Sequence, residues 1–169
     1  MRYVEAPDEF DGVGRGLFLA GGISGTEDWQ SSVTKLLGET DLVLLNPRRR
    51  NYAFEDPGAA REQIAWEFRH LRRAWGRLFW FPPETLCPIA LFELGAWSRT
   101  EGPLFVGTHP AYARRLDATV QLELARPDVR VASSVEELAG QVMAVVGVGS
   151  SVGPREVHHA CVDPGRHSE

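Results

Sequence analysis

Short apolar runs alternate with amphipathic segments along most of the chain, and this alternation restricts the fold more than any other feature. Each run has the length of a strand and is bounded by turn residues. The five runs are residues 16–22, 41–47, 77–83, 103–109 and 129–133. Runs as apolar as these are typical of strands buried on both faces, as in a parallel sheet covered by helices.

Helix patterns fill the gaps between these runs, at residues 26–39, 57–75, 87–99, 111–125 and 134–147. Thr26 is expected to cap the first of these helices. In the second, Ile64, Phe68 and Leu71 form the predicted buried stripe. Five strand and helix pairs predict an α/β domain with a doubly wound, five-stranded parallel sheet between two helix layers. In this flavodoxin-like or Rossmann-like three-layer sandwich, the expected strand order is 2-1-3-4-5.

Length and composition fit one compact domain. The chain has 169 residues, 43% of them hydrophobic, which is enough for a core that folds alone. The predicted domain spans residues 14–148. Residues 1–13 are polar with glycines and are predicted to form a flexible N-terminal segment, and residues 149–169 lack periodicity and are predicted to form a flexible C-terminal tail.

Charge and cysteine content argue against several classes of protein. A net charge of -5 disfavours broad binding to a nucleic acid polymer. Cys87 and Cys161 suggest neither a disulfide framework nor a zinc site, and His158 and His159 form an adjacent pair without further ligands. No export signal opens the chain, and no apolar run is long enough to span a bilayer. We expect a cytoplasmic protein without a metal site.

Ligands in such a fold bind beyond the carboxyl ends of the strands, so the loops there are the candidate site. Residues 20–29 are rich in glycine and lead into a helix N-terminus, which suits a phosphate, a sugar or a carboxylate, although the glycines could serve only a tight turn. Residues 46–52 combine amide, guanidinium and phenol groups, or form a solvated basic turn. Residues 82–88 lead towards Glu93.

Glu93 is the most conspicuous candidate, because it lies inside the otherwise almost wholly apolar stretch of residues 84–97. An ionised carboxylate taken out of water costs several kcal/mol unless it is paired or neutralised. Glu93 therefore lies at the rim of a cleft with a chemical role, or is satisfied by a backbone cap or an arginine. Gly95 and Ala96 beside it leave room for a ligand to approach.

Three motifs give the chain a family resemblance: "LAGGISGTEDWQ" at residues 19–30, "LLNPRR" at 44–49 and "FWFPPETLCPIALFELG" at 79–95. At these intervals the chain resembles the nucleoside 2-deoxyribosyltransferase family, most closely its nucleoside 2-deoxyribosyltransferase-like branch. The similarity continues towards residue 140 and covers most of the predicted domain. Family members place the catalytic nucleophile at the glutamate of an "E(L/I)G.A" pattern, which is Glu93 here.

The resemblance implies an enzyme that cleaves the N-glycosidic bond of a nucleoside, a deoxynucleoside or a nucleoside 5'-monophosphate. Glu93 would attack the anomeric carbon, and the glycosyl-enzyme ester would then pass to another base or to water. The activity would be that of a nucleoside 2-deoxyribosyltransferase or an N-glycosidase, with no cofactor. Transfer and hydrolysis stay open, because they differ in whether water reaches the ester first.

The resemblance also implies substrate-binding residues. Those of the first loop are Gly21, Gly22, Ile23, Ser24, Asp28 and Trp29. Asn46, Arg48 and Arg49 are candidates for holding a hydroxyl, a 5'-phosphate or the base, and a guanidinium here would favour a nucleotide. The best known transferases carry a base-handling aspartate where this chain has Cys87, so the general acid is open. Glu84 is a candidate substitute, or a helix-start residue favoured by the macrodipole.

Two alternative functions remain, a phosphoribohydrolase-like nucleotide hydrolase and a non-catalytic nucleotide-sensing module. "GGISGTED" resembles the "PGG.GT..E" signature of phosphoribohydrolases, but with an extra residue and after the first strand. Family members assemble as homo-oligomers with shared active sites, which implies a dimer or larger here. The segment with Tyr112, Arg114, Arg115 and Asp117 is the candidate to reach a partner's cleft.

Overall fold

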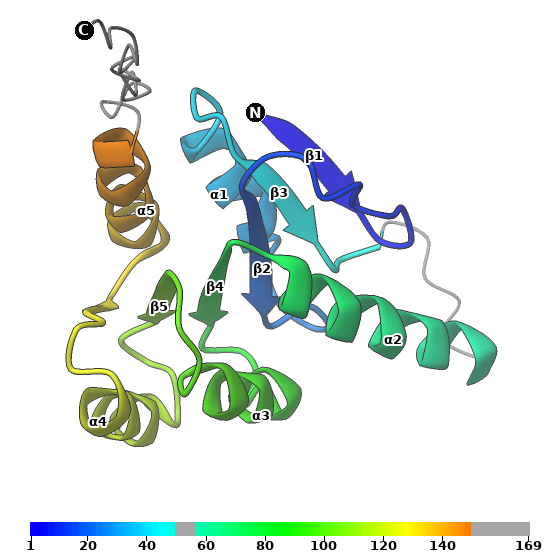
Figure 1. The fold of residues 1–169 in the computed structure, drawn as a ribbon. Helices are drawn as coiled ribbons and strands as arrows, with labels where there is room; N and C mark the ends of the chain where they lie inside the picture. Colours follow the sequence, from blue (N-terminus) through cyan, green and yellow to red (C-terminus); the bar gives the residue numbers. More distant parts are fainter. Residues whose placement is uncertain (50–56, 150–169) are drawn as a thin grey trace, which may run out of the picture.

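The structure is a computed structural model that describes residues 1–49 and 57–149 (Figure 1). Within these residues it contains six strands and five helices. In chain order they are β1 (Arg2–Glu5), β2 (Gly16–Gly21), α1 (Trp29–Leu36), β3 (Val43–Asn46), α2 (Pro57–Arg73), β4 (Gly76–Phe81), α3 (Pro88–Trp97), β5 (Leu104–Thr108), α4 (Arg115–Ala125), β6 (Val131–Ala132) and α5 (Val135–Gly149). The predicted C-terminal tail, apart from Gly149, lies outside the described residues.

All the strands lie in one parallel sheet with the order β1-β3-β2-β4-β5-β6. Five of them are the predicted strands, and their order is the predicted 2-1-3-4-5. The predicted number of five was wrong, because β1 adds a sixth strand beside β3, from Arg2 opposite Val43 to Glu5 opposite Asn46. An edge strand is only half covered, so β1 forms without the continuous apolar run that marks the other strands.

The N-terminal segment, predicted to be flexible, is anchored on α2. The indole N–H of Trp66 donates to the carbonyl of Asp8 at 2.8 Å, and the backbone N–H of Phe10 donates to Nε2 of His70 at 3.1 Å. The Phe10 side chain is buried against Gly16, where an added Cβ would lie 3.0 Å from the phenyl ring. Residues 2–10 are therefore packed as part of the folded domain.

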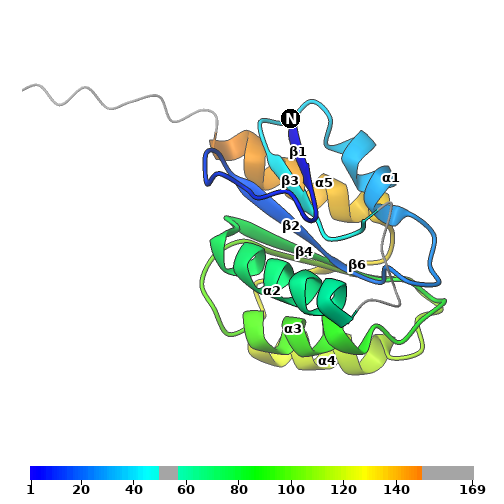
Figure 2. The same cartoon turned by 90° about the vertical axis from the view of Figure 1, so that its right-hand side faces the viewer.

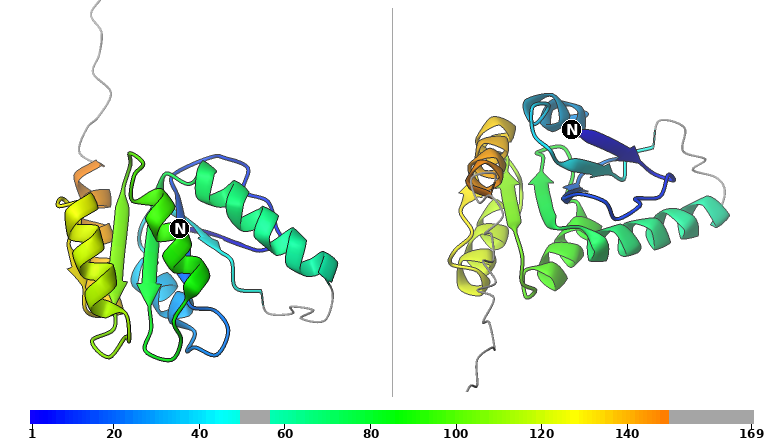
Figure 3. Two further views of the ribbon diagram at one scale, coloured as in Figure 1. Left: turned by 90° about the horizontal axis from the view of Figure 1, so that it is seen from below. Right: turned by 45° about the horizontal axis from the view of Figure 1, so that its top comes forward.

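Helices cover both faces of the sheet, with α1 and α5 on one face and α2, α3 and α4 on the other (Figures 2 and 3). Successive residues of a strand point to opposite faces, so β2 contributes to two separate cores. Leu17 and Leu19 pack on the α1 and α5 side, and Phe18 and Ala20 pack on the α2 to α4 side. The sheet thus fixes which loop residues face each side at its carboxyl edge.

The predicted buried stripe of α2 was largely wrong. Ile64 and Phe68 are 66% and 61% exposed, and of the three predicted residues only Leu71 is buried. The buried face instead carries Trp66 and His70, because both side chains donate or accept hydrogen bonds with the N-terminal segment. The apolar pattern of α2 therefore did not predict that Trp66 and His70 point towards the core.

The first helix begins later than predicted, and its cap is Asp28 rather than Thr26. The Asp28 carboxylate accepts the backbone N–H of Ser31 at 3.1 Å and the Ser31 hydroxyl at 2.6 Å. The Thr26 hydroxyl donates instead to the Gly22 carbonyl at 3.2 Å and so closes the loop before the helix. Across residues 1–49 and 57–149, no helix has the length and hydropathy that crossing a membrane requires.

Candidate active site

Two cavities open at the carboxyl edge of the sheet, one on each face. The cavity on the α2 and α3 side has a volume of about 280 Å³ and contains Glu93. Its walls come from β2 and the loop after it, from α2, and from the start of α3. Its lining residues are Phe18, Ala20, Gly21, Gly22, Ile23, Ser24, Pro47, Glu67, Thr85, Cys87, Pro88, Ile89, Ala90 and Glu93.

Two glycines allow the loop after β2 to pass between the two cavities. Gly21 has a φ of 149°, and a Cβ added there would lie 2.2 Å from the carbonyl oxygen of Trp80. A Cβ on Gly22 would lie 2.9 Å from Pro82 and 3.1 Å from the Cys87 sulfur. No side chain fits at either position, so the glycine pair is required for close approach as well as for the turn.

Glu93 lies in the second turn of α3, half-buried, and faces the cavity. Burial, and to a lesser degree the neighbouring carboxylate of Glu67, raise the pKa of Glu93 to about 7. A carboxyl group in this condition exchanges its proton close to neutral pH, as many acid and base catalysts do. Burial of the carboxyl group in the cavity is thus the main cause of the raised pKa of Glu93.

Glu67 of α2 is the functional candidate that sequence reasoning missed. One of its carboxylate oxygens accepts a hydrogen bond from the amide of Gln63 at 2.8 Å, and the same amide donates to the Pro47 carbonyl at 2.7 Å. Burial raises the pKa of Glu67, while Gln63 and the charge of Arg49 oppose the shift. The available signal was a polar stripe on α2, because Gln63, Glu67 and His70 recur at helical spacing.

Cys87 caps the N-terminus of α3 in the left-handed conformation, with φ of 46° and ψ of 54°. Its thiol is buried at the wall of the cavity, and burial followed by the charge of Glu84 raises its pKa to about 11. The thiol therefore stays protonated at neutral pH and is too weak an acid to protonate a leaving base. This agrees with the sequence analysis, in which Cys87 could not replace the base-handling aspartate of the best known transferases.

Three of the predicted substrate-binding residues face the other cavity. Asp28, Trp29 and Glu84 line the space between α1 and α5 and are not among the residues around Glu93. Glu84 therefore does not lie beside the nucleophile candidate as a general acid would. Gly21, Gly22, Ile23 and Ser24 are brought together with Glu93 as expected.

The predicted loop after β3 is held mostly by contacts within the protein. Asn46 is buried, with its amide donating to the Tyr3 hydroxyl at 2.7 Å. Arg48 donates to Gln30 at 3.0 Å and to the Thr26 hydroxyl at 3.0 Å, so its guanidinium braces the loop before α1.

Arg49, the third candidate of this loop, lies beside α2. Its guanidinium lies 3.1 Å from the Glu62 carboxylate, and its charge also lowers the pKa of Glu67. Arg49 is therefore placed to act on Glu67 through its charge.

Metal ligation finds no support in the described part of the chain. No three His, Cys, Asp or Glu side chains among residues 1–49 and 57–149 converge as a metal ion needs. His158, His159 and Cys161 lie outside the described residues.

Comparison with known proteins connects this cavity to a family. A search of curated proteins gave no match. The family model described as "Nucleoside 2-deoxyribosyltransferase like" matches residues 14–112, more than half of the chain. The match runs from before β2 to beyond β5 and includes the glycine loop, Glu67 and Glu93. The chain that builds this two-carboxylate cavity therefore belongs to the nucleoside 2-deoxyribosyltransferase-like family.

Proposed function

We propose that the protein cleaves the N-glycosidic bond of a nucleoside, a deoxynucleoside or a nucleoside 5'-monophosphate through a glycosyl ester on Glu93. Family membership supports glycosyl transfer or hydrolysis in general and implies a nucleoside substrate. The observation that carries the proposal is the pair of carboxyl groups, Glu67 and Glu93, that line one cavity. Paired carboxyl groups are the usual machinery for breaking a glycosidic bond.

In the first step, a carboxylate oxygen of Glu93 bonds to the anomeric carbon while the bond from that carbon to the base nitrogen breaks. The electron pair of the broken bond stays with the base, which takes a proton from Glu67. In the second step, water or another base attacks the anomeric carbon, Glu67 accepts the proton that the attacking group loses, and Glu93 leaves as a carboxylate. No cofactor takes part in either step.

The electrostatics of the pair favour Glu93 as the nucleophile and Glu67 as the proton donor. Two carboxyl groups in one half-buried cavity disfavour double ionisation, so near neutral pH the pair retains a proton. A bound nucleoside places the developing positive charge of its sugar against Glu93, which favours the ionised form there. The proton then remains for Glu67, where Gln63 holds one oxygen in place.

The glycine loop is the proposed sugar side of the cavity. Gly21 and Gly22 bring backbone rather than side chains to the wall, and Ile23 and Ser24 complete it. Arg48 uses its Nε and Nη2 within the protein, which leaves only Nη1 for a 5'-phosphate. A comparison of nucleosides with their 5'-monophosphates tests whether the phosphate is required.

The experiment is chromatographic detection of free base from a panel of nucleosides and nucleotides, with and without a second base. We expect Glu93→Gln to lower the rate by about 10³-fold or more and Glu67→Gln by about 10² to 10³-fold. Glu123→Gln, on the exposed surface of α4, is the matched control and should retain full activity. A new nucleoside formed with the second base would indicate transfer, and free base alone would indicate hydrolysis.

Mass spectrometry of the denatured protein tests the covalent step directly. A slow substrate should add the mass of one sugar to the native protein and none to Glu93→Gln. Base release that persists in Glu93→Gln would contradict the proposed nucleophile. Saturable binding without release from any panel member would instead support the nucleotide-sensing alternative.

The protein is also proposed to act as a homo-oligomer. Large apolar side chains are exposed along the face formed by α2, α3 and α4; they are Ile64, Phe68, Leu86, Ile89, Phe92, Leu116, Val120 and Leu124. This apolar face, as we call these eight residues, borders the catalytic cavity, since Ile89 belongs to both. A second copy on the apolar face would keep water away from the glycosyl ester.

The segment predicted to reach a partner's cleft is only partly free to do so. Tyr112 is buried and donates to the Leu86 carbonyl at 2.8 Å, and Arg115 donates to Thr108 and Ser133 of its own chain. Arg114 and Asp117 remain exposed, 3.6 Å from each other. Any contribution from this segment to a neighbouring cavity would therefore come from these two residues.

A further inference from the structure

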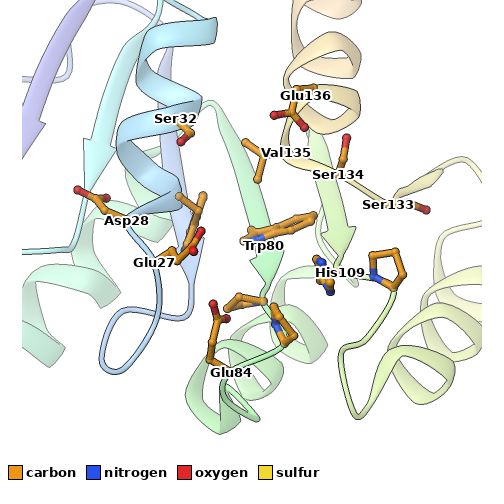
Figure 4. A pocket seen from close by; sticks show the side chains of 14 residues that line it. Glu27, Asp28, Ser32, Trp80, Glu84, His109, Ser133, Ser134, Val135 and Glu136 are labelled. Carbon is orange, nitrogen blue, oxygen red and sulfur yellow. The ribbon is translucent and has the colours of Figure 1, made fainter.

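The larger cavity at the carboxyl edge of the sheet lies between α1 and α5, on the face opposite Glu93 (Figure 4). Its volume is about 610 Å³, within the range of cavities that hold a drug-sized ligand. Within the described residues, the two cavities share no lining residue. Gly22 packs between Pro82 of this larger cavity and Cys87 of the cavity that contains Glu93, so a single layer of residues separates the two spaces there.

Acidic side chains reach the larger cavity from three different elements. Glu27 comes from the loop before α1, Glu84 from the loop after β4, and Glu136 from the first turn of α5 (Figure 4). In the part of the chain that the structure describes, none of these three carboxylates has a hydrogen-bond or ion-pair partner, and no lysine or arginine lines the cavity. Three unpaired negative charges around one space favour a cationic occupant.

The spacing of these carboxylates argues for an organic cation rather than a metal ion. A metal ion needs three or more ligands around one point, and no such group occurs among the described residues. A molecule with several ammonium groups spread over its framework can instead meet each carboxylate separately. The volume of the cavity agrees with a ligand of that size.

Trp80 gives an independent indication that the cavity holds a ligand. Its side chain is only 5% exposed and lies across the middle of the cavity, between Glu27 and His109 (Figure 4). The other two buried tryptophans, Trp29 and Trp66, each donate their indole N–H to a carbonyl at 2.8 Å. The indole N–H of Trp80 has no acceptor among the described residues, and it is not one of their fully buried unpaired polar atoms, so it opens to the cavity and can donate to a ligand there.

His109 adds a second donor on the same wall. Its Nδ1 accepts the backbone N–H of Ala111 at 3.1 Å, so in the neutral ring the proton lies on Nε2. The cavity therefore presents both carboxylates, which require donors from a ligand, and N–H groups, which require acceptors. A simple alkylamine offers only donors and would make no hydrogen bond to the indole N–H.

We propose that this larger cavity is a second binding site, for an amino sugar: an organic polycation whose hydroxyl and ether oxygens are acceptors. Its ammonium groups pair with Glu27, Glu84 and Glu136. Its oxygens accept from Trp80 and His109, and the indole face provides a favourable surface for a cation.

The test is calorimetric titration of the native protein with neamine, a small amino sugar, at about 0.15 M salt, where weak surface attraction is screened. Sucrose, a neutral sugar of similar size, is the control ligand. We expect neamine to bind with one-to-one stoichiometry and sucrose not to bind. Absence of neamine binding, or equal binding of sucrose, would overturn the proposal.

Variants connect the binding to this cavity. Glu84→Gln together with Glu136→Gln should weaken neamine at least about tenfold, because each removes one charged hydrogen bond. Both residues are exposed, so the variant should fold normally. Glu123→Gln on α4 removes one negative charge, as each of the two cavity substitutions does, and should leave the affinity unchanged. Equal affinity in the cavity variant would overturn the proposal.

Trp80→Phe removes the indole N–H but also leaves space in the core, so its folding is checked by circular dichroism. If it folds, its affinity should fall as well; unaltered affinity would overturn the role of the indole N–H. Because binding is measured directly and without a nucleoside, these outcomes do not depend on the proposed glycosidic reaction.

Discussion

At the residue scale, Glu93 makes the stability of the protein depend on pH. Its pKa rises from 4.5 to about 7 in the folded state, so the folded protein binds this proton more tightly than the unfolded chain. The stability that follows is present below pH 4.5 and is lost as the pH rises through 7, by up to about 3 kcal/mol. Ionisation of Glu93 in the cavity therefore lowers the free energy of unfolding.

Glu93→Gln should remove this dependence. We expect the variant to gain up to about 3 kcal/mol over the native protein between pH 4.5 and pH 8, because an amide has no charge to bury. Urea unfolding at pH 5 and pH 8 measures the difference. Glu123→Gln, exposed on α4, is the control and should show nearly the same gap at both pH values. A constant gap for Glu93→Gln would show that Glu93 is solvated.

Two glycines near the site should respond to alanine in opposite ways. Gly22→Ala places its Cβ 2.9 Å from Pro82 and should destabilise the protein by about 1 to 3 kcal/mol. Gly95→Ala, inside α3, meets no atom within 4 Å and should stabilise by about 0.5 to 1 kcal/mol. Thermal unfolding of both variants measures this. Equal tolerance at both positions would contradict the close packing between the cavities.

At the element scale, the docking of the N-terminal segment on α2 depends on a neutral imidazole. Burial lowers the pKa of His70, and Nε2 must be unprotonated to accept the Phe10 N–H. A lowered pKa means that stability is present above the unfolded value, about 6.5, and is lost as the pH falls below it. The segment should therefore loosen in acid before the sheet does.

Hydrogen exchange measures this loosening. After correction for intrinsic rates, the protection of the Phe10 amide should fall between pH 7 and pH 5, while amides of β4 remain protected. In His70→Gln the remaining protection should no longer vary with pH across this range, because an amide side chain does not titrate. Uniform protection of Phe10 in the native protein would mean that the histidine is not the anchor.

The elements also show what the sequence can and cannot predict. β2 to β5 were predictable because a strand buried on both faces must be continuously apolar. β6, an edge strand of two residues, was predicted from the shorter run at residues 129–133. β1 was not, since Arg2–Glu5 is short, begins and ends with a charged residue and does not alternate between exposed and buried positions. In α2 the apolar pattern pointed to Ile64 and Phe68, whereas the inward face is set by hydrogen bonds from the N-terminal segment, which lies far away in sequence.

The candidate site was predictable to a similar extent. Glu93 and the glycine loop could be recognised because each occupies a local stretch with unusual composition. Glu67 was harder to recognise, because its sequence signal, the polar stripe of α2, lies among many other charged residues. Its place in the same cavity as Glu93 follows only from the packing of α2 and α3. Glu84 was misjudged because sequence proximity to Glu93 does not tell which face of the sheet a loop residue takes.

At the scale of the whole molecule, the apolar face predicts self-association. Multi-angle light scattering at micromolar concentration should give a dimer or larger for the native protein, since exposed apolar area of this extent is unusual on a monomer. Phe92→Ser with Leu124→Ser should shift the equilibrium towards monomer. Val145→Ser, an exposed apolar residue of α5 on the other face, should not. A native monomer would contradict the homo-oligomer.

The all-parallel sheet has a further consequence, for the order in which the protein assembles. Parallel neighbours need a long crossover between them, so no two adjacent strands can form a local hairpin. The central strand β2 has both partners only after β3 and β4 have been synthesised, and Glu93 follows β4 in the chain. A ribosome-bound chain that ends before α3 therefore already contains Glu67 and the glycine loop. The cavity that contains Glu93 closes only when the ten residues of α3 fold against them.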